Sequence, residues 1–163
     1  MVELEIRAAG ADDFDGIWPI FSAVVAAGDT LAYDPGTTQD QARALWMNAV
    51  QETFVVTAGG RVAGTYFIRP NAPALGAHVA NAGYMVAPEM RGHGLARAMC
   101  LHSLDVARAR GYLAMQFNFV VSTNATAIAV WAGCGFRTVG RVPKAFRHRE
   151  HGLVDVLVMH RRL

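Results

Sequence analysis

The stretch of residues 86–99 contains the backbone and side chains best suited to chemistry in this chain. Arg91, Gly92, His93 and Gly94 form a turn there, between an apolar run and a segment with helical spacing. The first N–H groups of a helix have no partner within the helix and carry the positive end of its dipole. Glycine lets a ligand approach this backbone closely, and Arg91 adds a fixed positive charge. The sequence therefore predicts a cradle for a phosphate or pyrophosphate group.

The two glycines also occur in other kinds of turn and binding motif, and the neighbouring residues help to distinguish these. A strand-to-helix turn that needs glycine only for its backbone angles is an open alternative. The P-loop is excluded because no Gly-Lys-Ser/Thr follows. The dinucleotide fingerprint fits poorly because Arg97 stands where the third glycine belongs. A dinucleotide-binding protein is therefore an alternative that rests on Gly92 and Gly94 alone.

Two segments at matching spacing resemble the GNAT superfamily of N-acyltransferases. Arg91, Gly94 and Ala96 form the pattern Arg-x-x-Gly-x-Ala, with Val-x-Pro upstream of it. This pattern is similar to the loop of that superfamily that binds the pyrophosphate of acyl-CoA. The segment Asn-x-x-Ala-x-x-x-Trp-x-x-x-Gly-Phe, which begins at Asn124, is similar to a second family segment that has tyrosine in place of Trp131. Taken alone, the second segment is also typical of a capped helix that ends at glycine.

The resemblance implies one GNAT domain over residues 1–163. The implied fold is α/β (α+β), with helices flanking a single mixed, mostly antiparallel sheet. The fourth and fifth strands of this sheet are expected to splay apart, with the pantetheine arm of acetyl-CoA, the implied cosubstrate, between them. The residues that the resemblance assigns to acetyl-CoA binding are Met85, Val86, Arg91, Gly92, His93, Gly94, Leu95, Ala96, Asn124 and Trp131.

Trp131 departs from the family pattern. Many members carry a tyrosine at this position, which is proposed to protonate the leaving thiolate. An indole N–H is a hydrogen-bond donor without useful acidity. Tyr84, Ser122 or water could take that role in this chain, and we expect Trp131 to pack near the cofactor.

A narrower resemblance concerns the acceptor. Residues 78–83 and 117–124 look like the corresponding strands of the N-acetyltransferases that detoxify L-azetidine-2-carboxylate and related proline analogues. This resemblance assigns Asn81 and Asn118 to substrate binding and catalysis. Asn118 also lies within an apolar strand, where an unsatisfied amide would cost about 1–3 kcal/mol. An asparagine that is bonded to neighbouring backbone is the alternative.

His78 is the candidate for removing a proton from the amine. It begins the strand that faces the acceptor, and an unperturbed histidine pKa of about 6.5 suits a general base. A structural histidine is the alternative. Because the rest of that strand holds no carboxylate, we favour a water chain near His78 over a glutamate base. The loop of residues 28–36 carries Thr30 and Tyr33, and we expect these residues to bind the acceptor.

The spacing of apolar residues and helix breakers predicts the elements that hold these side chains. In order they are a strand over residues 2–7, two helices, three strands, a helix, a strand, a helix and two strands. Pro19 should kink or restart the first helix. The mostly apolar run 113–121 is typical of a central strand buried on both faces. We expect a basic loop at residues 143–152 between the last two strands.

Composition limits the remaining classes. The 163 residues are 53% apolar and 17% charged, which fits one globular domain. The net charge of +2 is too small to indicate nucleic-acid binding, and no apolar run reaches membrane-spanning length. Residues 1–7 carry no secretion signal, and Cys100 and Cys134 fit reduced thiols in a cytoplasm. His148 and His151 lack further ligands at suitable spacing, so we expect no metal.

These observations lead to one functional hypothesis and its alternatives. We expect a cytoplasmic, acetyl-CoA-dependent N-acetyltransferase that acts on the amine of a small molecule, such as an amino acid or a proline analogue. The reaction would be a direct attack in a ternary complex. No nucleic acid or membrane partner is expected, and the resemblance implies a homodimer. The alternatives are a non-catalytic acyl-CoA-binding module and a GNAT enzyme that acts on a peptide or protein amine.

Overall fold

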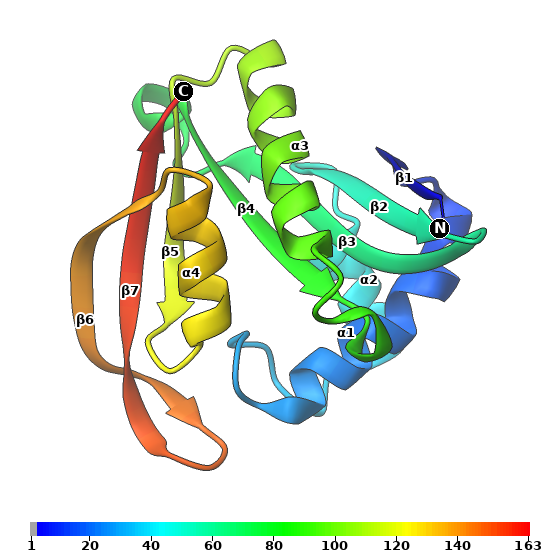
Figure 1. Cartoon of the computed structure of the whole chain (residues 1–163), viewed down its shortest axis with the longest axis horizontal. Coiled ribbons are helices and arrows are strands. Elements are labelled where there is room, and N and C mark those ends of the chain that lie inside the picture. Colours follow the sequence, from blue (N-terminus) through cyan, green and yellow to red (C-terminus); the bar gives the residue numbers. More distant parts are fainter. Residues whose placement is uncertain (1–2) are drawn as a thin grey trace.

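The computed structural model describes residues 3–163 of the chain (Figure 1). The strands are β1 (Leu4–Ala8), β2 (Glu52–Ala58), β3 (Arg61–Pro70), β4 (Val79–Val86), β5 (Ala114–Val121), β6 (Arg137–His148) and β7 (Gly152–Arg162). The α-helices are α1 (Phe14–Ala27), α2 (Gln39–Trp46), α3 (Leu95–Ala109) and α4 (Ala125–Gly133). The predicted first strand began at Val2, which lies outside the described residues.

Within the described residues, all seven strands belong to one sheet in the order β1-β2-β3-β4-β5-β7-β6. Neighbouring strands run antiparallel, except for β4 and β5, which are parallel. The predicted fold class, a mixed and mostly antiparallel sheet flanked by helices, is therefore confirmed.

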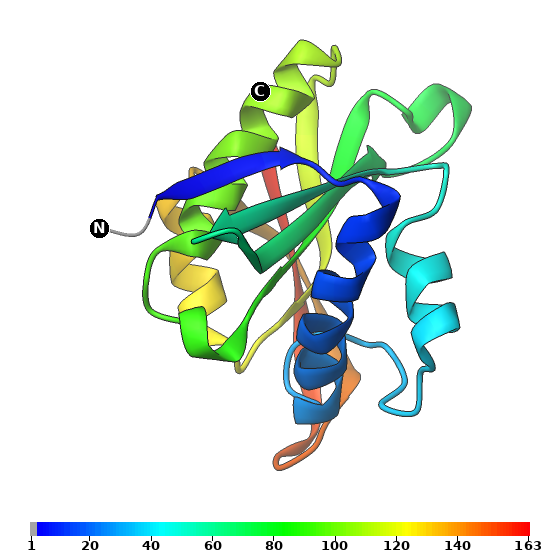
Figure 2. The same ribbon diagram turned by 90° about the vertical axis from the view of Figure 1, so that its right-hand side faces the viewer.

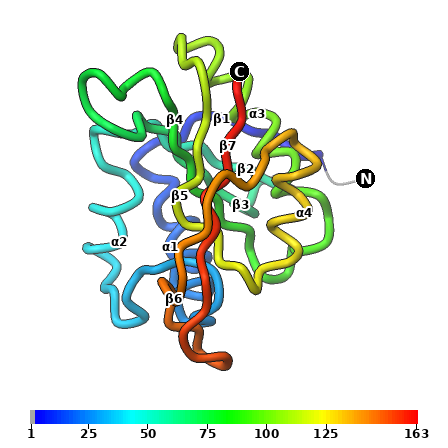
Figure 3. Tube along the Cα trace, turned by 90° about the vertical axis from the view of Figure 1, so that its left-hand side faces the viewer, coloured from blue at the N-terminus to red at the C-terminus, as the bar shows by residue number. Residues whose placement is uncertain are grey.

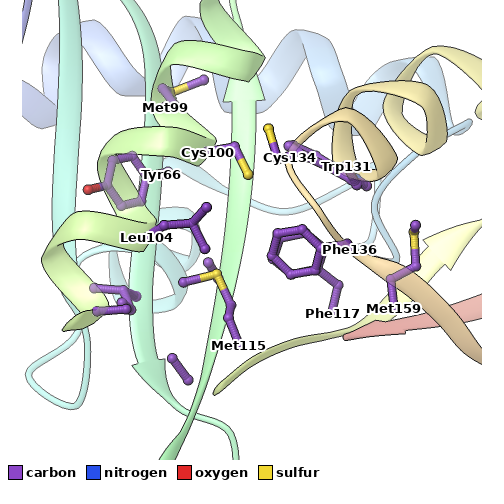
Figure 4. Packing of buried hydrophobic residues seen from close by; sticks show 14 of the residues in the cluster. Tyr66, Met99, Cys100, Leu104, Met115, Phe117, Trp131, Cys134, Phe136 and Met159 are labelled. Carbon is purple, nitrogen blue, oxygen red and sulfur yellow. The ribbon is translucent and has the colours of Figure 1, made fainter. Parts of the chain in front are cut away.

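The helices cover both faces of the sheet (Figure 2). On one face, Phe21 of α1 and Trp46 of α2 pack with Phe67 of β3. On the other face, α3 and α4 pack over a second apolar cluster, in which Trp131 lies beside Phe117 of β5 (Figure 4). Burial of these large side chains is the main force that holds the two helical layers on the sheet.

The pairing of β4 with β5 is short. The two strands pair only at Val79 with Ala114 and at Ala80 with Met115, and they then diverge (Figure 1). At the next position, the Asn81 Nδ2 group donates a hydrogen bond to the carbonyl oxygen of Gln116, at 3.0 Å. The Asn81 side chain thus makes the last hydrogen bond from β4 to the main chain of β5 before the gap opens. The predicted splay of the fourth and fifth strands is present.

The helix ends follow the capping residues of the sequence. The Thr38 hydroxyl accepts a hydrogen bond from the Gln41 N–H, and the Gln41 side chain accepts one from the Thr38 N–H. The Asn124 side chain accepts a hydrogen bond from the Ala127 N–H. The apolar spacing predicts that the helix capped by Thr38 runs to Val50, but α2 ends at Trp46. The carbonyl oxygen of Trp46 accepts hydrogen bonds from the Gln51 and Thr53 side chains.

Pro19 does not restart the first helix, which is one of the two outcomes expected for it, because α1 runs as one helix from Phe14 to Ala27. Pro19 lies on the exposed side of α1, while Ile17, Ile20 and Phe21 on either side of it are buried. The buried contacts therefore outweigh the lost main-chain hydrogen bond at proline.

The prediction that β5 is buried on both faces is also wrong. Asn118 and Phe119 are exposed. At this point β4 has moved away, and the register between β5 and β7 shifts between Phe117 and Val120. The apolar composition of residues 113–121 therefore gives no sign that the sheet opens locally at Asn118 and Phe119.

The basic segment 143–152 is mostly strand and not a loop. β6 continues to His148, and Phe146 pairs with Val154 of β7. The interruption is confined to the region of Lys144, whose φ angle is 48°. The β6–β7 hairpin consequently reaches the end of α1, where the Arg149 N–H donates to the carbonyl oxygen of Gly28 at 3.0 Å (Figure 3).

Candidate active site

A cavity of about 860 Å³ lies at the gap between β4 and β5. Its walls come from β4, β5, α4, the start of α3 and the loop between α1 and α2. Because α1 and α3 cover opposite faces of the sheet, the cavity passes through the sheet. We call its two parts the helix end, lined by Arg91, Gly92, Gly94, Leu95, Ala96 and Arg97, and the loop end, lined by Asp29, Thr30, Leu31, Tyr33, Phe67 and Arg69.

The helix end is an open cradle of backbone N–H groups. Gly92 and Gly94 both have a φ angle of 78°, in the left-handed region that favours glycine. The first turn of α3 closes with the Ala98 N–H bonded to the Gly94 carbonyl oxygen at 3.0 Å, so the three preceding N–H groups have no partner within the helix. A side chain added at either glycine would meet no protein atom within 4 Å. The geometry fits a pyrophosphate group at this end.

The middle of the cavity has an aromatic wall. The rings of Tyr84 and Trp131 lie 4.8 Å apart, and both residues line the cavity. The Tyr84 hydroxyl lies 2.7 Å from the Ser103 hydroxyl of α3, and burial raises the pKa of Tyr84 well above its usual value. The phenol is thus bonded inside the core and is not presented to the cavity as an acid. Ser122, the other predicted substitute, is not among the lining residues.

Asn81 and Asn118 both line the cavity, as the sequence predicts. Asn81 is buried and bonded to β5, as described above. Asn118 is exposed, and its Nδ2 group donates to the Asn71 side chain at 2.6 Å while its Oδ1 atom accepts from Gln116 at 2.9 Å. The expectation that Asn118 is a buried amide in need of partners is wrong, but the structure brings the two asparagines to one opening.

The structure does not bring His78 or His93 to the cavity. His78 is exposed in the turn before β4, where its carbonyl oxygen accepts a hydrogen bond from the Leu113 N–H. This is the end at which β4 and β5 still pair, away from the gap. His93 is exposed, and its Nδ1 atom lies 3.0 Å from the Arg91 carbonyl oxygen. His78 is therefore not placed to act as a general base.

The loop end contains the two predicted acceptor residues, Thr30 and Tyr33. Burial raises the pKa of the Tyr33 phenol, and the positive charge of Arg69 lowers it in part. Sequence reasoning missed Asp29, although it lies in the loop predicted to bind the acceptor. It also missed Arg69, for which alternation along β3 gives a signal, because Phe67 and Arg69 share one face of that strand.

The remaining histidines have structural contacts. The Tyr66 hydroxyl lies 2.7 Å from Nδ1 of His102, in agreement with a satisfied core residue. Nδ1 of His148 accepts hydrogen bonds from the N–H groups of Glu150 and His151. Within residues 3–163, no three His, Cys, Asp or Glu side chains are grouped as metal ligands would be. In the same part of the chain, no helix is long and apolar enough to cross a membrane.

Comparisons with known proteins agree with this geometry. A GCN5-related N-acetyltransferase from Kribbella flavida has a solved structure that is 46% identical and superimposes with a TM-score of 0.94, over 98% of each chain. This match confirms the GNAT fold. A phosphinothricin acetyltransferase (Pat) of the GNAT superfamily from Sinorhizobium meliloti, solved in complex with acetyl-CoA, is 19% identical with a TM-score of 0.86, over 98% of this chain and 88% of that one. At that identity the likeness concerns the fold alone.

A curated relative and a family match extend the comparison. The N-acetyltransferase aca1 of Schizosaccharomyces pombe is 32% identical over 96 residues, which are 58% of this chain and 46% of aca1. The chain therefore covers less than half the length of this curated relative. The acetyltransferase (GNAT) family matches residues 20–136, which include the helix end of the cavity and both asparagines. The chain belongs to the acetyltransferase (GNAT) family.

Proposed function

We propose that this protein is an N-acetyltransferase that transfers the acetyl group of acetyl-CoA to the amine of a small molecule. The observation that carries the proposal is the single cavity that passes through the sheet. It joins an anion cradle at the start of α3 to a separate, partly polar pocket on the opposite face. One reactant can enter from each face and meet the other at the gap between β4 and β5.

The helix end suits the acyl-CoA donor. The free N–H groups of α3, together with Arg91 and Arg97, offer donors and positive charge to a pyrophosphate. Met85 and Val86 continue the wall along β4, and Trp131 of α4 forms the aromatic wall with Tyr84. Acetyl-CoA would supply the activated acyl group. The protein would hold this group and the amine at attack distance, an effect that can be worth about 7–11 kcal/mol.

The proton steps are assigned to water. An amine is largely protonated at neutral pH and must lose a proton before it attacks the thioester carbonyl. His78 lies away from the cavity, and the indole of Trp131 is not an acid. The Tyr84 hydroxyl is bonded inside the core. We therefore propose that water takes the proton of the amine and protonates the leaving thiolate, while Asn81 and Asn118 hold the reacting groups.

The acceptor identity rests on the resemblance to the proline-analogue acetyltransferases. On that basis an amino acid, proline or L-azetidine-2-carboxylate is the first acceptor to test. The wider GNAT family resemblance supports a homodimer. Both cysteines are free, which fits a cytoplasmic enzyme.

One observation favours a second function, an acyl-CoA-binding module without turnover. Trp131 replaces the tyrosine that many family members carry, and neither Tyr84 nor Ser122 presents a hydroxyl in its place. A third possibility within the family is an enzyme that acts on a peptide or protein amine. These alternatives differ from the main proposal in what they do to acetyl-CoA and in which amines they accept.

Consumption of acetyl-CoA across a panel of amines separates the three functions. The panel holds amino acids, proline analogues, simple amines and peptides with free N-termini, and free CoA thiol is measured with and without protein. We expect turnover of at least one small amine above the hydrolysis without amine. CoA binding in a calorimeter without turnover of any amine would establish the binding module. Turnover of peptides alone would show that the acceptor is a peptide or protein amine.

A further inference from the structure

Charged residues are distributed unevenly along the cavity. Among the described residues, those with a formal charge that line it are Asp29, Arg69, Arg91 and Arg97. Arg91 and Arg97 flank the start of α3, at the helix end. The loop end therefore carries one negative side chain, Asp29, and one positive side chain, Arg69. Neither of them belongs to the helix end, where the pyrophosphate is proposed to bind.

Arg69 is placed to bind an anion. It is the cross-strand partner of Asn81 in the β3–β4 register, so it stands next to the gap at which transfer is proposed. Its guanidinium carbon lies 5.1 Å from the centre of the Phe67 ring, and it forms no ion pair with another described residue. An arginine held on an aromatic ring keeps its fork of N–H donors free for a carboxylate.

Asp29 is placed to bind a cation. It follows Gly28, whose left-handed backbone ends α1, and the Arg149 side chain fixes this turn by donating to the Ala26 carbonyl oxygen. The Asp29 Oδ1 atom is buried and accepts no hydrogen bond from the described residues. Because Oδ1 is buried without a hydrogen-bond donor, a positively charged donor at Oδ2 would stabilise the negative charge of this carboxylate.

We propose that Arg69 and Asp29 select acceptors that carry a carboxylate beside the amine. Arg69 binds the carboxylate, and Asp29 holds the amine nitrogen. The inference rests on the proposed function, because it assigns the loop end to the acceptor of acetyl transfer. A carboxylate accepts a hydrogen bond from an ammonium and from a neutral amine, so Asp29 can hold the nitrogen before and after the proton leaves for water.

The charge arrangement also disfavours some acceptors. An acceptor without a carboxylate would leave the exposed Arg69 guanidinium to water and would gain nothing from its charge. A peptide N-terminus has an amide where an amino acid has its carboxylate, so it would leave Arg69 unpaired in the same way. Free amino acids and their close analogues satisfy both charges at once.

The test compares each amino acid acceptor with its own carboxamide, which has the same side chain but lacks the negative charge that Arg69 is proposed to bind. The wild-type protein should show kcat/KM for the acid at least tenfold above that for the amide. Arg69→Gln should lower kcat/KM for the acid by about 10- to 100-fold and leave the amide within threefold. Asp29→Asn should raise KM about tenfold for acid and amide alike, because it weakens the contact to the nitrogen that both share.

Matched controls lie on the same or neighbouring elements. Arg61→Gln removes an arginine at the opposite end of β3, and Asp12→Asn removes an exposed aspartate before α1. Neither residue lines the cavity, and both variants should behave as the wild type. The CoA dissociation constant, measured in a calorimeter, should be within twofold of wild type in all four variants, which also shows that each one is folded.

The possible results separate this inference from the proposed function. Turnover of amides as fast as acids, or an Arg69→Gln variant that keeps the preference for acids, overturns the inference and leaves the acetyltransferase standing. The absence of turnover with any amine overturns the proposed function. In that case, the acid and the amide are titrated into protein saturated with CoA. Equal affinities for the two would also overturn the proposed selection of acceptors that carry a carboxylate.

Discussion

Gly94 is the residue at which the proposed donor site can be tested most directly. It opens α3 with a φ angle of 78°, and a side chain at this position would meet no protein atom. In the protein alone that space is free, so a side chain there would obstruct only a ligand. Gly94→Val should weaken CoA binding at least tenfold in a calorimeter, because valine would occupy the space of the pyrophosphate.

A matched control separates loss of the site from loss of stability. Valine in the left-handed region costs about 1–2 kcal/mol wherever it is placed. Gly111 has a φ angle of 82° and equally open surroundings, but it lies outside the cavity. Gly111→Val should lose similar stability in urea unfolding and keep its CoA affinity. A folded Gly94→Val protein with wild-type CoA affinity would be incompatible with the cradle.

At the scale of the elements, the divergence of β4 and β5 decides which residues can take part in catalysis. Asn81 makes the last hydrogen bond from β4 to the main chain of β5, and Asn118 lies on the part of β5 that no longer pairs with β4. Both therefore face the same opening from opposite strands. We expect Asn118→Ala to lower kcat about 100-fold, since losing one donor to a developing oxyanion typically costs about 2.7–4 kcal/mol. Asn81→Ala should chiefly raise KM for the amine.

Steady-state kinetics of both variants, with CoA affinity as the reference, test these roles. CoA binding should change less than the rate in Asn118→Ala. Gln116→Ala is an informative companion, because it removes the hydrogen bond to Asn118 but leaves the backbone carbonyl that Asn81 uses. If both asparagine variants keep wild-type kcat and KM, neither asparagine belongs to the active site.

The element scale also shows where sequence reasoning works. The order of the elements and the caps at Thr38 and Asn124 follow from local patterns, because apolar spacing and side-chain caps act over a few residues. The cradle was predicted in the same way, from Gly92 and Gly94 and the helix that follows. The narrower family resemblance proposed Asn81, and Asn81 lies on the cavity wall, where its link to the carbonyl oxygen of Gln116 is a tertiary contact.

The failures have a common physical cause. The position of His78 depends on which end of β4 faces the gap, and the exposure of Asn118 depends on a register shift against β7. Arg69 joins the loop end only through its register with Asn81. Each of these facts is set by pairing between distant strands. Alternation along β3 places Arg69 on the same face as Phe67, but it does not show that this face meets the gap. The helix does not restart at Pro19 for a related reason, since the buried residues on either side of Pro19 hold α1 together.

At the scale of the whole molecule, a half-buried histidine ties stability to pH. His102 of α3 contacts the Tyr66 hydroxyl and the Phe54 ring, with Asp105 as the nearby charge. Burial lowers the pKa of His102, and Asp105 offsets this effect in part. The folded protein therefore resists protonation at His102, whereas the unfolded chain takes up this proton near the ordinary histidine pKa of about 6.5.

The sign of the effect follows from proton linkage. Where the unfolded state binds more protons than the folded state, stability falls as pH falls. The contribution of His102 is thus complete above about pH 7 and is lost as pH drops below about 6.5 toward the lowered pKa. Urea midpoints should fall between pH 7.5 and pH 5.5 in the wild type, and less steeply in His102→Gln. Above pH 7.5, where histidine no longer titrates, the two curves should run parallel. Equal slopes below pH 7 would show that this histidine does not couple folding to protonation.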